Sequence, residues 1–500
     1  MTATGTTNSH HTGHAARLKA NVIGPWGLAA LVIGVTSPAI GLFAMWGPIE
    51  AMAGPVVPLV FLGALAIILP TVLSYASLNR HAPSAGAAAS WLRTAANPTT
   101  GLIAGLVMLT YFLMTAITVP LLFALFFRDF LDWAHVAIPG MAALTIGVVL
   151  QSAVIAAICV RGAAVSIKTT ILLMLIEISV VLALSATILW VRGGQPGGIN
   201  LHPFDPAYAT HGFSGFWAAI ILGILAFSGF DVVATAAEEA QAPREHVPRV
   251  LIFAILGIGF FWALNAWVLS LSATPDAVAR YNAQGLSAIT PVAGTYWGGG
   301  NLIVIATAFT GLTAIYISCV QGASRLVFSM ARQGLLPRPF AQLAGAQRVP
   351  RNAILAVVML CVVMGLLSLA LLRDGLDSFV WWSSAMVFFA ALTFTGVNAA
   401  NILYFRRILP AQFRFVRNLL VPLWGIAVSL YLVYAAFFSA LWSAPFRTGR
   451  SIVIACLVVF VLELAAVAWM RMFRGGLFSA PSPRGDAFED AHEVIEPHIA

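Results

Sequence analysis

The sequence predicts an all-α polytopic membrane protein with about twelve transmembrane helices, and three observations support this prediction. Sixty per cent of the 500 residues are hydrophobic and only 9% are charged, about a third of the charged fraction of an average soluble domain. Apolar stretches of about 20 residues, the length a helix needs to cross a hydrocarbon core of about 30 Å, recur along the chain. The basic residues are distributed between the connections as membrane topology requires.

Each of twelve apolar stretches is predicted to form one membrane helix. They lie near residues 27–46, 54–78, 99–127, 137–160, 164–192, 213–236, 249–273, 300–329, 353–372, 377–405, 419–440 and 450–470. The first is expected to remain in the protein, because it has no small-residue cleavage site and leads directly into further membrane-length segments. Cysteines inside these stretches lack a CxxC spacing, which predicts small core residues rather than disulfides or a metal site; they are Cys159, Cys319, Cys361 and Cys456.

The positions of Lys and Arg predict the orientation in the membrane. With both termini in the cytoplasm, 20 of the 26 basic residues lie on the cytoplasmic side and 6 on the other side. This is the positive-inside rule, so the net charge of +8 reflects topology rather than nucleic-acid binding. We expect a multi-pass protein of the plasma (cell inner) membrane with the lipid bilayer as its partner, either a monomer or a homodimer.

The polar segments predict the domain organisation. Residues 1–24 and 476–500 are expected to be disordered cytoplasmic tails, because they contain too few apolar residues to form a core. The connection at about 193–212 carries Gly, Pro and Asp and divides the chain into comparable halves. Helices one to five are therefore expected within 25–192, helices six to ten within 193–405, and helices eleven and twelve within 406–475.

Two of the predicted helices carry breaks near their middle. The first reads Gly-Val-Thr-Ser-Pro-Ala-Ile-Gly-Leu-Phe over 34–43, and the sixth reads Leu-Ala-Phe-Ser-Gly-Phe-Asp over 225–231. Proline removes a backbone donor and clashes with the preceding turn, and glycine lowers helix stability, so a membrane helix would unwind at these points. A packing kink is the alternative for either segment alone.

The pair of breaks predicts a polar cavity at the middle of the membrane, because unwound backbone needs partners there. Amide donors of one half-helix suit a carboxylate, and carbonyl acceptors of the other suit an ammonium or a cation. A break in corresponding positions of two halves indicates a substrate site in transporters built from inverted repeats. The expected substrate-binding residues are Thr36, Ser37, Pro38, Ala39, Ile40, Gly41, Phe227, Ser228, Gly229 and Phe230.

Residues 226–239 (Ala-Phe-Ser-Gly-Phe-Asp-Val-Val-Ala-Thr-Ala-Ala-Glu-Glu), followed by Ala-Pro-Arg-Glu-His-Val-Pro-Arg over 242–249, resemble the sixth-helix signature of the amino acid-polyamine-organocation (APC) permeases. Segments 75–86 and 323–337 are similar to that family's loop after helix two and its end of helix eight. The resemblance covers about 25–475. It implies a LeuT-like five-plus-five inverted repeat with discontinuous helices 1 and 6.

Four residues depart from the family pattern. Ala39 and Ile40 replace the first two residues of a Gly-Ser-Gly-Ile-Phe turn, which implies a differently shaped carboxylate cradle. Leu225 stands where several relatives carry an aromatic gate, so Phe227 or Tyr316 is the alternative residue to close the site. Helix five offers Glu177 where relatives often carry a lysine that substitutes for sodium.

Two deep acids are candidates for proton coupling or gating. Asp231 lies at the second break, and a carboxylate inside the membrane costs several kcal/mol unless it is protonated, paired or hydrated. A structural cap is the alternative for Asp231. Glu177 is the other solitary deep acid, and a neutral glutamic acid bonded to a neighbouring helix is its alternative. Glu463, on the last helix, is interpreted as structural.

Charged and aromatic residues complete the set of expected functional positions. Glu238, Glu239 and Arg325 are expected to form a cytoplasmic gate, with solvated helix ends as the alternative. Tyr111, Tyr316, Trp381 and Trp382 are expected on helices three, eight and ten, where they would line the cavity; core packing or an interfacial belt is the alternative.

The function predicted from these features is secondary active transport of an amino acid or a similar small solute by alternating access, as proton-coupled symport. The alternatives are an exchanger of amino acids or polyamines, another LeuT-like carrier of a nucleobase or organocation, or a channel-like or receptor protein. No GxxxxGK[ST], HExxH or GxSxG motif is present, so neither an ATP-driven pump nor an enzyme is expected. We expect no cofactor, with a proton gradient as the driving force and sodium as the alternative.

Overall fold

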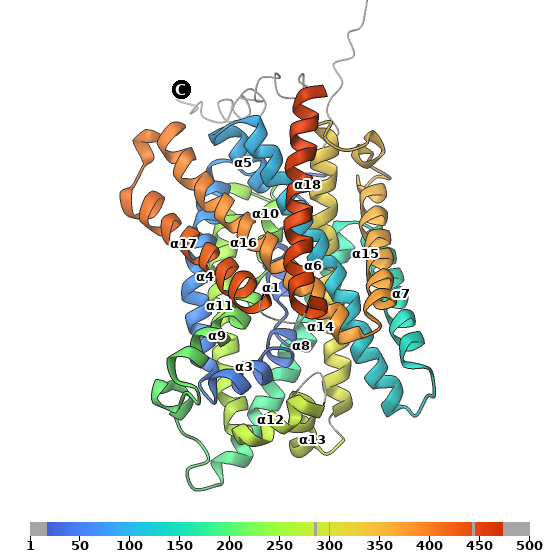
Figure 1. Ribbon diagram of the computed structural model, residues 1–500, viewed down its shortest axis with the longest axis vertical. Helices are drawn as coiled ribbons and strands as arrows, with labels where there is room; N and C mark the ends of the chain where they lie inside the picture. The colour runs from blue at the N-terminus through green and yellow to red at the C-terminus, as the bar shows by residue number, and fades with distance from the viewer. Residues whose placement is uncertain (1–17, 285–287, 300, 443–445, 474–500) are drawn as a thin grey trace, which may run out of the picture.

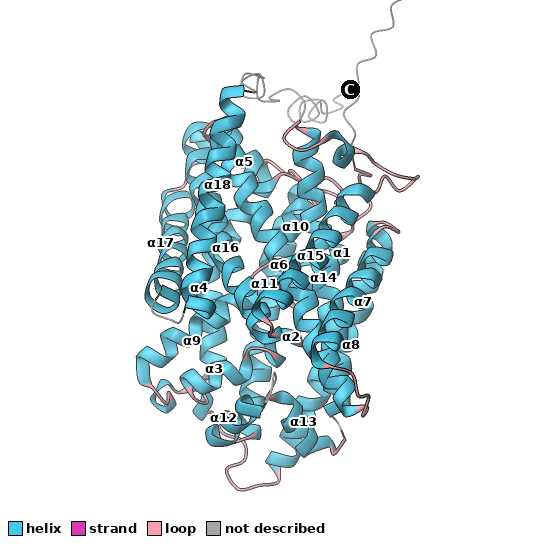
Figure 2. Ribbon diagram, turned by 45° about the vertical axis from the view of Figure 1, so that its right-hand side comes forward, coloured by secondary structure: helices cyan, strands magenta, loops and turns pink. Residues whose placement is uncertain are grey.

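The computed structural model describes residues 18–284, 288–299, 301–442 and 446–473. Every regular element within these ranges is helical (Figure 2). Twelve of the helices in this part of the chain are long and apolar enough to cross a membrane. This confirms the predicted fold class, an all-α membrane protein of LeuT-like type. The expected tails fall largely on residues 1–17 and 474–500, outside the described ranges.

The first five spans include one interrupted helix. They are α1 (Pro25–Thr36) with α2 (Ile40–Phe43), α4 (Val57–His81), α6 (Pro98–Trp133), α7 (Gly140–Cys159) and α8 (Ala163–Gly193). The next five repeat this order: α9 (Gly212–Phe227) with α10 (Val232–Thr235), α11 (Pro243–Ser272), α14 (Asn301–Arg332), α15 (Arg351–Leu372) and α16 (Gly375–Arg407). The last two spans are η5 (Val416–Leu420), α17 (Val421–Val433) and η6 (Tyr434–Leu441) as one continuous segment, and α18 (Ser451–Phe473).

Short helices lie at the two ends of the bundle (Figure 1). One end carries α5 (Ala87–Ala95), and the other carries α3 (Trp46–Ala53), α12 (Pro275–Gln284) and α13 (Ile289–Trp297); we call them the α5 end and the α12 end. The connections also contain the single turns η1 (His202–Phe204), η2 (Pro206–Tyr208), η3 (Arg338–Ala341), η4 (Pro410–Gln412) and η7 (Phe446–Arg450). The hydropathy pattern did not predict these short helices, because none has the length of a membrane span.

Local sequence explains where the longest helix, α6, begins. At the start of α6, the Asn97 side chain accepts from the Thr100 amide over 2.9 Å, and the Thr100 hydroxyl accepts from the Asn97 amide over 3.3 Å. This capping box satisfies amides that have no partner within the helix, and Pro98 at the first helical position needs none. α6 has 36 residues, about 54 Å of helix, so it extends beyond a hydrocarbon core of about 30 Å.

The breaks predicted in the first and sixth helices are present and lie side by side. α1 ends before Ser37, whose φ of +50° is rare for a residue with a side chain, and α9 ends before Gly229, whose φ is +98°. A Cβ on Gly229 would lie 2.7 Å from Val35 of α1. The segment before α1 is tied to the segment after α10, because the Ile23 amide donates to the Glu239 carbonyl and the Gln241 amide donates to the Ile23 carbonyl.

Candidate functional site

Glu177 of α8 reaches into the break between α1 and α2. Its Oε2 accepts a hydrogen bond from the Ser37 hydroxyl and a second from the Ala39 amide over 3.1 Å. Ser37 in turn accepts from the Ile40 amide over 3.1 Å. The Glu177 side chain is fully buried, and its other oxygen, Oε1, has no partner among the described residues. The sequence placed Glu177 near this region but did not predict this contact.

The amides expected to hold a substrate carboxylate are therefore already paired. Ala39 donates to Glu177, Ile40 donates to Ser37, and the Gly41 amide donates to the Ser37 carbonyl over 3.1 Å. A carboxylate of the protein thus occupies the position where we expected a carboxylate of the substrate. In this conformation a ligand can use Ala39 and the Ser37 hydroxyl only by replacing Glu177.

Close packing fixes this arrangement from two sides. On α14, a Cβ on Gly311 would lie 2.8 Å from both Ser37 Oγ and Ile40 Cγ1, and 3.1 Å from Glu177 Oε2. On α11, the indole of Trp262 covers Gly41, and its Nε1 donates to the Pro38 carbonyl over 3.1 Å. The sequence analysis missed Trp262, because nothing in the pattern of α11 distinguishes it from other apolar core residues.

Asp231, at the second break, is held by two tyrosines. The Tyr75 hydroxyl of α4 donates to Oδ2 over 3.0 Å, and the Tyr111 hydroxyl of α6 donates to Oδ1 over 3.2 Å. All three side chains are buried. Phe230 packs edge-on against Tyr75, with ring centroids 5.5 Å apart. Tyr75 belongs to the motif after helix two but was not predicted as a site residue, because its pairing depends on a helix far away in the sequence.

Several predicted site residues do not reach the breaks. The Tyr316 hydroxyl lies 3.2 Å from that of Ser152 on α7, and Trp381 donates to Ser451 at the start of α18 over 3.3 Å. At 3.6 residues per turn, Tyr316 lies about 160° around α14 from Ser318, whose hydroxyl lies near Gly34 of α1. Helix rotation therefore turns Tyr316 away from the candidate site.

The polar side chains on either side of the breaks bond to their own helices. Thr36 donates to the Val32 carbonyl over 3.0 Å, and Ser228 lies 3.5 Å from the Ile224 carbonyl. Phe227 packs on Trp262, with ring centroids 4.9 Å apart, so it is part of the core beside α11. These three residues sit at the breaks as predicted, but their side chains satisfy or pack against neighbouring protein.

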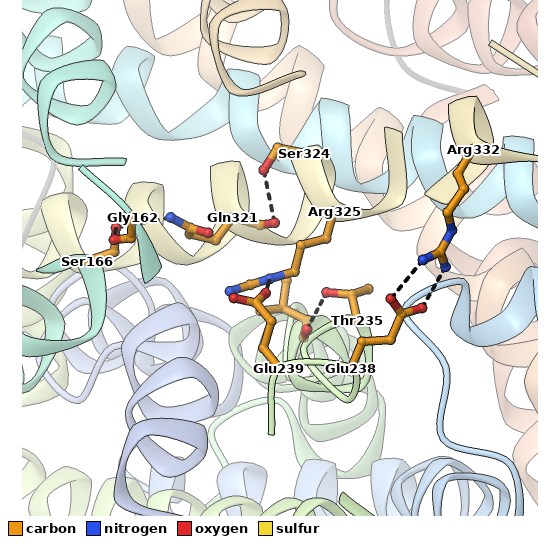
Figure 3. Close-up of polar contacts among 10 residues, drawn as sticks. Gly162, Ser166, Thr235, Glu238, Glu239, Gln321, Ser324, Arg325 and Arg332 are labelled. Carbon is orange, nitrogen blue, oxygen red and sulfur yellow. Dashed lines mark hydrogen bonds and ion pairs between the residues drawn. The ribbon is translucent and has the colours of Figure 1, made fainter. Parts of the chain in front are cut away.

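At the α5 end, two ion pairs join the end of the sixth span to α14 (Figure 3). Glu239 accepts from Arg325 Nε, with both side chains buried, and Glu238 accepts from Arg332 over 2.8 and 3.1 Å. The terminal nitrogens of Arg325 have no partner within the described chain. The structure thus brings Glu238, Glu239 and Arg325 together and adds Arg332, which the sequence analysis did not include.

Toward the α12 end, a cavity of about 870 Å³ lies between α3 and α9 on one side and α6, α16, α17 and η6 on the other. Its lining includes Met45, Met52, Leu122 and Leu225, and contains no charged side chain. Phe227 and Tyr316, the alternatives to an aromatic gate, do not line it. Leu225, two residues before the end of α9, is the part of the lining that comes nearest in sequence to the second break.

A buried acid that the sequence analysis did not single out lies beside this region. Glu50 of α3 accepts from the Ser270 hydroxyl over 3.1 Å, and Trp46 donates to Ser270 over 3.3 Å. Burial raises the pKa of the Glu50 carboxyl well above its usual range, and the hydrogen bonds from Ser270 and Trp46 oppose that shift. Glu50, which lies outside the candidate membrane spans, therefore links α3 to α11.

Known proteins resemble this chain over most of its length. A sequence profile of the amino acid permease family matches residues 23–462. The branched-chain amino acid permease BcaP of Lactococcus lactis subsp. cremoris is 27% identical over 357 residues, which cover 67% of this chain and 74% of that protein. The low-affinity putrescine importer PlaP of Escherichia coli K12 is 27% identical over 371 residues, covering 73% and 76%. Human cationic amino acid transporter 4 is 30% identical over 195 residues, covering 38% and 29%.

Proposed function

The chain belongs to the amino acid permease family, and from that premise we propose that it moves amino acids across the plasma membrane as a proton-coupled symporter. The observation that supports this most strongly is the contrast between the two ends of the bundle. Ion pairs close the α5 end, whereas a cavity lies between the same groups of helices toward the α12 end. Alternating access requires such an asymmetry around a central site.

The moving group in this proposal consists of α1, α2, α4, α9, α10 and α11. Its polar links to the remaining helices include Ser37 and Ala39 with Glu177, Asp231 with Tyr111, and the two ion pairs at the α5 end. Asn398 of α16 also bonds to Ser74 and Thr71 of α4, and Ser185 of α8 bonds to Asn265 of α11. Each of these contacts must break or rearrange when the cavity closes and the α5 end opens. The acids proposed for coupling, Asp231 and Glu177, therefore also lie where the motion takes place.

The orientation follows from the basic residues. Both termini and the α5 end are proposed to face the cytoplasm, which places most Lys and Arg on that side. In this orientation the cavity faces outward, which supports the proposal of an outward-facing state. No sodium ion is required by this scheme, and sodium coupling remains the alternative to proton coupling.

The proposed substrate is an amino acid with an uncharged, apolar side chain. The lining of the cavity supports this choice, because a charged side chain would lose its hydration there without gaining a partner. The similarity to BcaP, a branched-chain amino acid permease, agrees with it. The second candidate is an amino acid or polyamine exchanger, which the similarity to the putrescine importer PlaP favours.

Uptake by the purified protein in liposomes tests the proposal. Radiolabelled leucine, phenylalanine, lysine and putrescine would be offered with and without an inward proton gradient, and with sodium inside and outside. We expect saturable leucine or phenylalanine uptake that the proton gradient drives against a concentration difference. Uptake that needs an unlabelled substrate inside the liposomes would identify an exchanger, and no uptake of any amino acid would refute the proposal.

A further inference from the structure

At the first break, only one of the two carboxylate oxygens of Glu177 is hydrogen-bonded. Oε2 receives two hydrogen bonds, from Ser37 and Ala39, whereas the fully buried Oε1 receives none from the described residues. A buried carboxylate oxygen without a donor is costly and is found where a ligand, a water or a proton completes it. The hydrogen bonds that Glu177 accepts from the break are therefore ones that a ligand can take over.

Among the residues that the structure describes, no charged side chain forms an ion pair with this carboxylate. Ser37, Ala39 and Ile40 face it from the break and Gly311 faces it from α14, and none of these titrates. Other helices touch α8 at a distance from Glu177: Asn265 of α11 bonds to Ser185, and Trp297 of α13 bonds to Thr187. Lys168, the basic residue of α8 nearest in sequence, is nine residues from Glu177, about 14 Å along the helix.

We propose that Glu177 is an internal competitor for the carboxylate of the substrate, and that Glu177 takes up the coupling proton when the substrate displaces it. The inference rests on the proposed function, since it assumes that the ligand is an amino acid. In the substrate-free protein, at a pH that ionises Glu177, its carboxylate accepts hydrogen bonds from the Ser37 hydroxyl and the Ala39 amide. The α-carboxylate of the entering amino acid then accepts the same two hydrogen bonds.

Displacement leaves the Glu177 carboxylate without donors in the membrane interior. An unpaired charge there costs several kcal/mol, so the carboxylate binds a proton from the aqueous phase on the cavity side. The site holds one ionised carboxylate with two donors before and after the exchange, and one proton enters with each amino acid. Asp231 keeps its own donors, Tyr75 and Tyr111, throughout this step.

Calorimetry on the full purified chain tests this exchange. Leucine, or whichever amino acid of the uptake panel binds most tightly, would be titrated in two buffers of different ionisation enthalpy at one pH, which gives the number of protons bound with the ligand. We expect about one proton per leucine for the wild type. For Glu177→Gln we expect none, with binding about tenfold tighter, because a neutral amide competes less well for the two donors than a carboxylate.

Matched controls separate competition from general damage. Glu463→Gln removes another acid that accepts from a threonine, Thr110, but lies on α18, outside the two sets of five spans, and it should bind leucine and protons as the wild type does. Leucinamide has no carboxylate, so Glu177→Gln should not tighten its binding. If Glu177→Gln fails to purify as a single species, Glu177→Asp, which is too short to reach Ala39, should tighten leucine binding and reduce proton uptake.

Two results would overturn the inference: Glu177→Gln that still binds one proton with leucine, or leucine binding that is unchanged or weaker in both variants at position 177. Failure of the proposed function would look different, because the wild type itself would then bind none of the amino acids in the panel.

Discussion

The Tyr75 hydroxyl on α4 donates to Asp231 Oδ2 over 3.0 Å, while Tyr111 on α6 donates to the other oxygen. Asp231 is thus held by one helix of the proposed moving group and by one helix outside it. Movement of one helix past the other therefore changes the hydrogen bonds that Asp231 accepts. The two tyrosines should therefore differ in their effect on transport.

We predict that Asp231→Asn abolishes proton-driven uptake or uncouples it from the proton gradient. An amide cannot carry the charge that Tyr75 and Tyr111 stabilise, and it cannot exchange a proton in the working pH range. Uptake in liposomes with and without a pH gradient measures the effect. Proton-driven uptake at the wild-type rate would show that Asp231 has no part in coupling.

Tyr111→Phe should slow transport more than Tyr75→Phe does. Each change removes one hydrogen bond to a buried carboxylate, at a cost of about 1–3 kcal/mol, so both variants should lose similar thermal stability in detergent. Only the Tyr111 bond crosses between the two groups of helices, and only its loss should change the rate of alternating access. Equal uptake rates for the two variants would contradict the proposed division of the bundle.

Gly311→Ala should reduce uptake strongly. The added Cβ would lie 2.8 Å from Ser37 Oγ and 3.1 Å from Glu177 Oε2, so the break and the glutamate must move apart. Overpacking of this kind costs about 1–3 kcal/mol. Gly257→Ala is the matched control, because a Cβ on Gly257 of α11 meets nothing within 4 Å. Uptake and substrate affinity of the two variants would be compared, and equal values would show that the packing against α14 is not needed.

Glu239→Gln should destabilise the closed α5 end. It leaves the buried Arg325 without its counter-ion, and breaking a buried pair from one side costs about 3–5 kcal/mol. Glu245→Gln, in the exposed pair with Arg249, should cost less than about 1 kcal/mol. Thermal unfolding in detergent measures both changes, and labelling of a cysteine introduced at position 235 would show whether the α5 end has opened.

The sequence alone predicted the fold because its signals are local. A membrane span needs about 20 apolar residues, and a break needs Pro or Gly within them, so both features can be found without knowing which helices are neighbours. Ser37, Pro38 and Gly229 marked the breaks in this way. Deep acids are equally conspicuous, which is why Asp231 and Glu177 were chosen before their partners were known.

The partners of these residues could not be predicted, because they depend on how each helix is rotated and packed. Tyr75 and Trp262 resemble other aromatic core residues in their sequence context, yet they bond to Asp231 and to the Pro38 carbonyl. Tyr316 is the converse case. Its position on the eighth span predicted that it lines the cavity, but its hydroxyl lies 3.2 Å from that of Ser152 on α7. Contacts between distant helices decide which residues form the candidate site.

Glu50 provides a prediction about pH. A carboxyl whose pKa is higher in the folded than in the unfolded protein keeps its proton longer when folded, so unfolding releases a proton and rising pH favours the unfolded state. Because burial raises the pKa of Glu50 above its ordinary value of 4.5, this residue should lower stability progressively as the pH rises above about 4.5.

Glu50→Gln removes the contribution of Glu50 to this pH dependence. The difference in Tm between Glu50→Gln and the wild type should therefore be small near pH 4.5 and should grow in favour of the variant toward pH 8. Asp276→Asn, which removes an exposed acid at the same end of the bundle, is the control for the loss of one acidic side chain. A variant less stable than the wild type at pH 8 would mean that the ionised Glu50 stabilises α3 through Ser270, contrary to the direction that burial implies.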